Sequence, residues 1–130
     1  MIFLFLTGCQ SLSVDIYGQM HEGTVDVSWD AILYRSEKTD WFDPWDEIPK
    51  LNDTQSLHTS PILLSTATLP SQPYVHLFTD ATVTYQNEQE IADIIEPIAC
   101  PIEWYGHYQI TITYIVIQEQ IFAMDCDVTR

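Results

Sequence analysis

The chain has 130 residues, of which 46% are hydrophobic and 12% aromatic. This composition is too apolar for a disordered protein and is sufficient for one domain with its own core. Asp and Glu number 19 against 4 Lys and Arg, giving a net charge of −15, and so few cations exclude a surface built to bind nucleic acid.

The chain opens on an apolar run, Ile2 to Leu6, that leads into Leu6-Thr7-Gly8-Cys9. This tetrapeptide resembles the lipobox of bacterial lipoproteins, in which an aliphatic residue, a small residue and Gly or Ala precede a cysteine that is lipidated. The run contains no Lys or Arg and is shorter than the roughly 7–15 apolar residues of a signal peptide. A buried N-terminal strand that ends in a Thr-Gly turn is therefore the alternative.

The resemblance to lipoproteins implies a location in the cell envelope and a membrane anchor. Residues 1–8 would be a truncated signal segment, residues 9–13 a tether with lipid (palmitate) on Cys9, and residues 14–130 the folded domain. Two or three acyl chains hold a protein firmly to a membrane. Gln10 stands where enteric lipoproteins of the inner membrane carry Asp, so we expect a periplasm-facing domain on the outer membrane of a Gram-negative cell.

The folded part of the sequence is rich in strand patterns. Thr24 to Tyr34 is the clearest, because apolar and polar residues alternate along it and give it one apolar face. Residues 36–60 are rich in Asp, Pro, Ser and Thr and predict a long loop. Strands are expected at residues 14–20, 24–34, 61–69, 74–85, 108–117 and 122–128.

One segment has a helical pattern. Asn87 could cap a short helix over residues 87–95, in which the isoleucines share a face, and Pro97 would end it. A strand through 91–95 is the alternative.

The last third of the chain predicts a β-hairpin. Its first arm is apolar on the face of Tyr108 to Val116, and its other face turns apolar only at Ile115 and Ile117. In the second arm, the alternation predicts one inward-facing set that consists of Phe122, Met124, Cys126 and Val128.

These short strands predict an all-β fold, a single small antiparallel β-sandwich. The step Gly106-His107-Tyr108 is similar to the start of a late strand in immunoglobulin-like and transthyretin-like domains. That resemblance implies a sandwich of one of these two kinds.

Cysteine parity is consistent with an exported protein. If lipid modifies Cys9, an even pair remains, Cys100 and Cys126, and an oxidising compartment favours a disulfide between them. Two separate buried thiols are the alternative.

The stretch from Thr39 to Pro49 is the most unusual part of the predicted loop, with three aromatic residues and four carboxylates within eight positions. Such a loop could cap one end of the sandwich, contact a partner through its rings, or offer oxygens to calcium. The candidate partner-binding residues are Trp41, Phe42, Asp43, Trp45, Asp46 and Glu47.

No sequence pattern indicates catalysis, a metal site or a cofactor. The four histidines are dispersed, and neither a nucleophile elbow nor a glycine-rich phosphate loop occurs. We therefore expect a non-enzymatic lipoprotein that acts as a structural, assembly or binding module on an envelope protein. The net charge leaves a second hypothesis open, an acidic inhibitor or capture protein for a cationic secreted enzyme or peptide.

Overall fold

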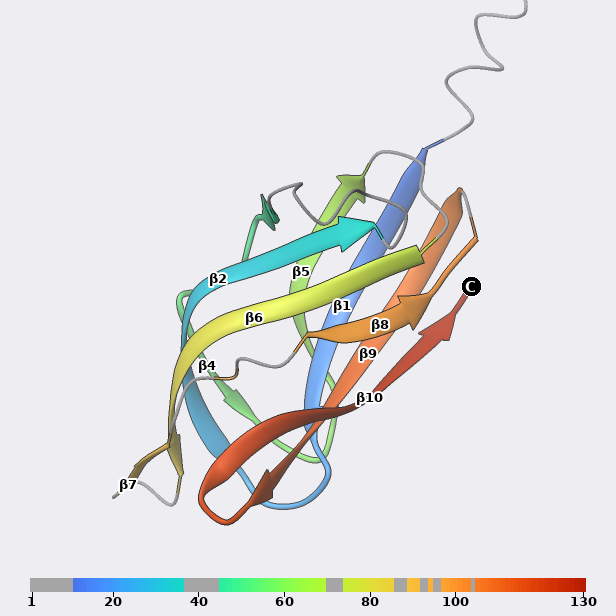
Figure 1. The fold of residues 1–130 in the computed structure, drawn as a ribbon. Helices are drawn as coiled ribbons and strands as arrows, with labels where there is room; N and C mark the ends of the chain where they lie inside the picture. The colour runs from blue at the N-terminus through green and yellow to red at the C-terminus, as the bar shows by residue number, and fades with distance from the viewer. Residues whose placement is uncertain are drawn as a thin grey trace, which may run out of the picture.

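A computed structural model describes residues 11–36, 45–69, 74–85, 89–91, 94, 97–103 and 105–130. These residues form ten strands in two sheets, which confirms the all-β sandwich (Figure 1). The strands are β1 (Leu12–Met20), β2 (Val25–Ser36), β3 (Asp46–Ile48), β4 (Thr54–Leu57), β5 (Ile62–Leu69), β6 (Tyr74–Tyr85), β7 (Gln89–Ile91), β8 (Ile98–Pro101), β9 (Gly106–Ile117) and β10 (Gln120–Thr129).

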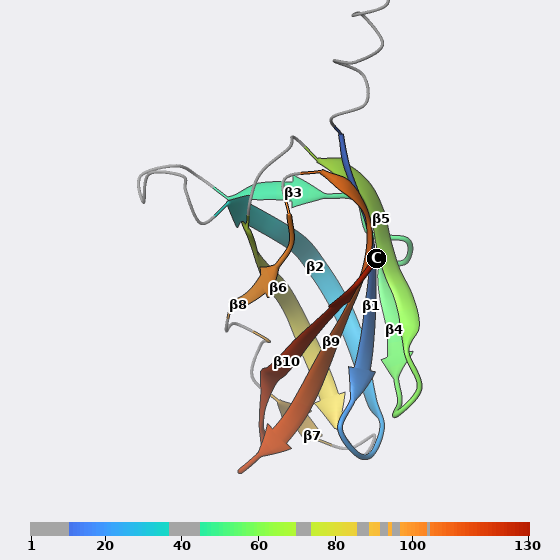
Figure 2. The ribbon, with the colours of Figure 1, turned by 90° about the vertical axis from the view of Figure 1, so that its right-hand side faces the viewer.

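The first sheet has the order β10-β9-β1-β5, and the second has the order β3-β2-β6-β7, with β4 also paired to β2 and β8 to β6 (Figures 1 and 2). Most pairs are antiparallel, as expected, but β1 runs parallel to β9 from Leu12 opposite Gly106 to Met20 opposite Tyr114. This pairing places the start of β1 and the start of β9 at the same end of the sandwich.

The core lies between the sheets. The sequence pattern predicts the inward side chains of β9 and of β2 as far as Trp29, but a bulge after Trp29 turns Ile32 and Tyr34 inward in place of Ala31. Trp29 of β2 is 3% exposed, and Tyr114 of β9 reaches Thr79 of β6 with its hydroxyl oxygen at 3.3 Å. Burial raises the pKa of Tyr114 to about 12, although the hydrogen bond with Thr79 acts to lower it. The phenol therefore stays neutral inside the core.

Three local expectations were wrong. Gln89–Ile91 pairs with β6 as strand β7, so the helix expected near 87–95 does not form there. Within the expected loop, β3 and β4 both add to the edge of β2. The first strand also starts at Leu12, two residues before the expected position, and Leu12 is fully buried.

The predicted hairpin forms, but a bulge changes which side chains face inward. The pairing shifts between Ala123 and Asp125, and Phe122 lies opposite Ile115 on the outer face. Ile121 takes the buried position instead, while Cys126 still faces inward opposite Ile112. The extra residue at the bulge is Met124.

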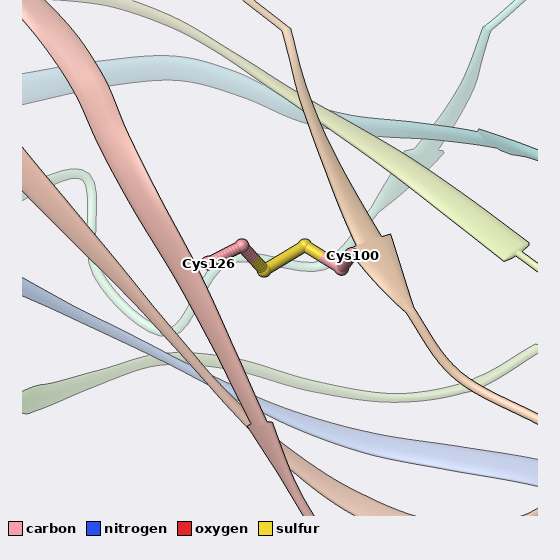
Figure 3. Close-up of a disulfide and its surroundings, with 2 residues drawn as sticks. All are labelled: Cys100 and Cys126. Carbon is pink, nitrogen blue, oxygen red and sulfur yellow. A yellow bond between two sulfur atoms is a disulfide. The ribbon is translucent and has the colours of Figure 1, made fainter.

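Cys100 and Cys126 form a disulfide between the two sheets (Figure 3). Their Cα atoms are 5.6 Å apart, within the usual range for the bond. Because Cys100 lies on β8 and Cys126 on β10, the bond joins the edge strand of one sheet to the edge strand of the other. The pairing expected from cysteine parity is confirmed.

The opposite edge of the sandwich is closed by hydrogen bonds. A bulge in β5 turns both Leu64 and Ser65 inward, and the Ser65 hydroxyl donates to the carbonyl of Pro49. The Leu51 N–H donates to the Leu64 carbonyl at 3.0 Å. Gly18 of β1 leaves the room that this bulge needs, since a Cβ there would lie 2.8 Å from a Leu64 methyl carbon.

Removal of the disulfide should lower the free energy of unfolding. The bond joins residues with a sequence separation of 26. A disulfide that closes a loop of this length stabilises a domain by about 3 kcal/mol, because it restricts the unfolded chain. Urea unfolding of the Cys100→Ala, Cys126→Ala double variant would measure the loss, and the parent protein under reducing agent is its control. A double variant as stable as the oxidised parent would contradict the role given to this bond.

Candidate functional site: the outer-face Trp45 cluster

Trp45 lies on the outer face of the second sheet. It immediately precedes β3, whose Asp46 pairs with Tyr34 of β2, so Trp45 comes beside Arg35. The Arg35 guanidinium carbon is 4.4 Å from the centre of the Trp45 ring, a cation–π geometry. Phe78 of β6 packs against the same ring, with the ring centres 5.8 Å apart and the planes tilted by 40°.

We call Arg35, Trp45 and Phe78 the Trp45 cluster. Ile32 and Tyr34 point into the core, and strand alternation therefore turns Arg35 outward. Trp45 is half-buried by its neighbours in the cluster and is not part of the core. Its ring packs against the outside of β2 and β6, so Trp45 does not cap the end of the core.

Carboxylates flank this cluster. Glu47 is exposed and pairs with Leu33, which places it on the same outer face as Trp45. Asp46 is also exposed, but it pairs with Tyr34 and so alternates along β3 with Trp45 and Glu47. Burial raises the pKa of Tyr34, and the Asp46 carboxylate raises it further. Tyr34 thus remains a neutral phenol, and Arg35 and Glu47 are charged groups that the described residues place on this part of the outer face.

The structure brings together only part of the candidate set predicted from the sequence. Trp45, Asp46 and Glu47 gather at β3, while Trp41, Phe42 and Asp43 lie outside the described residues. Cys9 also lies outside them. Arg35 and Phe78 were not predicted as site residues, because only the pairing of β2 with β3 and β6 brings them against Trp45.

A second apolar surface lies at the tip of the β9–β10 hairpin. Ile115 and Phe122 form a cross-strand pair on the outer face, and Ile117 and Met124 are 51% and 50% exposed. The two-residue turn has positive φ angles at Gln118 (53°) and Glu119 (65°), a conformation that residues with a side chain adopt at a cost. The sequence pattern shows that this face turns apolar without indicating a role for it.

Away from the hairpin tip, over β1, β5 and the start of β9, the outer face of the first sheet is polar. A carboxylate oxygen of Asp15 on β1 lies 2.9 Å from Nε2 of His107, and threonines cover the neighbouring positions of β5 and β9. Among the described residues, no three His, Cys, Asp or Glu side chains gather as a metal site. Nor does that part of the chain contain a helix long and apolar enough to cross a membrane.

No protein-family model and no curated protein matches this sequence, so its surfaces are the basis for a functional proposal.

The two tryptophans Trp29 and Trp45 should respond differently to truncation. Trp29→Ala removes a core ring and should cost about 3–5 kcal/mol. Trp45→Ala removes a ring from the outer face and should cost about 1 kcal/mol, close to the average for a point substitution. Urea unfolding of both variants beside the parent tests this, and an equal loss in both would show that the Trp45 cluster is structural support.

Proposed function

We propose that this chain is a lipid-anchored lipoprotein of the cell envelope that acts as a non-catalytic binding module. The observation that carries the binding role is the Trp45 cluster. Trp, Tyr and Arg are the residue types that most often dominate interface energies, and here a Trp and an Arg stack on each other outside the core. A ring already held by Phe78 loses little side-chain entropy when a partner covers it.

Three features support the lipid anchor and the location in the cell envelope. The lipobox-like Leu6-Thr7-Gly8-Cys9 supplies the lipidation site, and only Gln10 and Ser11 separate Cys9 from the start of β1. The Cys100–Cys126 disulfide suits an exported protein, because disulfides persist in oxidising compartments such as the periplasm. Gln10 after the cysteine favours the outer membrane.

The first test of the anchor is fractionation. Expressed from its full gene in a Gram-negative host, the protein should enter the membrane fraction, and Cys9→Ser should release it to the soluble fraction because no acyl chain remains. Immunoblots of both fractions measure the shift, and Cys9→Ala serves as a second variant. Equal membrane association of parent and variants would contradict the lipid anchor.

An acidic capture protein is the second candidate, and the carboxylates beside the Trp45 cluster favour it. Glu47 and the net charge of −15 would attract a cationic enzyme or peptide from a distance. The same cluster serves both candidates, and they differ in whether charge or apolar contact holds the partner.

A pull-down from envelope extract tests the binding role and separates the two candidates. Retention of the partner should fall severalfold with Trp45→Ala and stay unchanged with Tyr17→Ala, a matched aromatic variant on the outer face of the first sheet. Loss of the partner at high salt would indicate charge capture, and retention would indicate an apolar interface. Equal retention by both variants would contradict the role of the Trp45 cluster.

A further inference from the structure

The attachment point of the tether defines one end of the sandwich. The Ser11 carbonyl accepts a hydrogen bond from the Gly106 N–H at 3.0 Å, and Leu12 beside it is fully buried. Only Gln10 separates Ser11 from Cys9, and two residues of chain span at most about 7 Å. A lipid on Cys9 would therefore hold the Gly106 end of the domain close to the bilayer.

An arginine and a tyrosine are held at this end. The Arg130 guanidinium lies 5.2 Å from the Tyr108 ring centre and donates to the Tyr105 carbonyl at 3.3 Å. Gly106 has a φ of 126°, and a Cβ there would lie 3.0 Å from an Arg130 nitrogen, so the glycine admits the guanidinium. The Tyr108 hydroxyl also donates to the Tyr105 carbonyl, at 3.2 Å. These contacts fix the backbone at Tyr105.

The same end presents groups that suit a lipid headgroup layer. Tyr105 is 50% exposed, and the Arg130 side chain is 54% exposed. Arg130 also forms an ion pair with Glu103, with the charged atoms 3.3 Å apart. The two charges cancel at this end, whereas the molecule as a whole is strongly acidic. A hollow of about 370 Å³ opens between Glu103, Tyr108 and Arg130.

We propose that the Tyr105–Arg130 end of the sandwich lies on the lipid headgroups, with the Arg130 guanidinium on headgroup phosphate and the Tyr105 ring at the interface. This inference rests on the lipid anchor of the proposed function. Arg forms strong hydrogen bonds with phosphate, and Tyr is enriched at membrane interfaces. The remaining surface, with its net negative charge, is repelled by an anionic bilayer.

The orientation has a consequence for partner binding. Strand β9 starts at Gly106 and runs to Ile117, so its 12 residues carry the hairpin tip about 35 Å from the membrane-facing end (Figure 1). The exposed Ile117, which lies beside the turn, is then presented to the periplasm at the end remote from the lipid.

Fluorescence quenching in vesicles tests this orientation. The acylated full chain, its mass checked for the lipid, is placed in phosphatidylethanolamine and phosphatidylglycerol vesicles that contain a lipid with a quencher on its headgroup. A fluorescent amino acid replaces Tyr105 in one variant and Ile117 in another. We expect severalfold quenching at position 105 and none at position 117. A probe at Thr129, near the same end, repeats the measurement if substitution at 105 disturbs folding.

The outcomes separate the anchor from the orientation. A chain that gains no acyl mass overturns the anchor and this inference with it. An acylated chain that is unquenched at 105 and 129, or quenched at 117, overturns the orientation alone. Arg130→Gln should reduce the quenching at 105, whereas Lys50→Gln, which removes one positive charge elsewhere on the sandwich, should not. Equal quenching in both would overturn the contact between Arg130 and phosphate.

Discussion

Closure of the two sheets along both lateral edges is the constraint on which the rest of the structure depends. On one edge the Cys100–Cys126 bond joins β8 to β10, and on the other Leu64 and Ser65 of β5 hydrogen-bond to the segment after β3. The β5 bulge and Gly18 make the second contact possible. Edges closed in this way offer less backbone to other chains, which leaves the outer faces and the two ends for recognition.

These outer surfaces differ in chemistry. The first sheet is polar around Asp15 and His107, whereas the second carries the Trp45 cluster with its acidic flank. The proposed anchor occupies one end and the apolar hairpin tip the other. In the proposed arrangement the lipid would fix the height and orientation of the domain, and the disulfide would keep the two sheets packed together while a partner binds on the outside.

The sequence predicts the features that depend on local alternation and not those that depend on distant pairing. Strand β2 as far as Trp29 and the inward face of β9 are recognisable because apolar and polar residues alternate along them, whereas the bulge after Trp29 is not. The bulge at Met124 reverses that alternation, and no residue type at this position marks a bulge in the sequence. Phe122 therefore faces outward where the sequence pattern predicts an inward position. Strands β3 and β7 have three residues each, too few to show a period. The Trp45 cluster is only half predictable, since pairing of distant strands supplies Arg35 and Phe78.

Photo-crosslinking in living cells tests most directly the central claim that the protein binds a partner through the outer face of its second sheet. A photoreactive amino acid at Glu47 lies beside the Trp45 cluster, and one at the exposed Thr66 lies on the polar outer face of the first sheet. We expect a discrete adduct from position 47 and none from position 66. An adduct from position 66 alone, or none from either position in a protein that reaches the envelope, would contradict the claim.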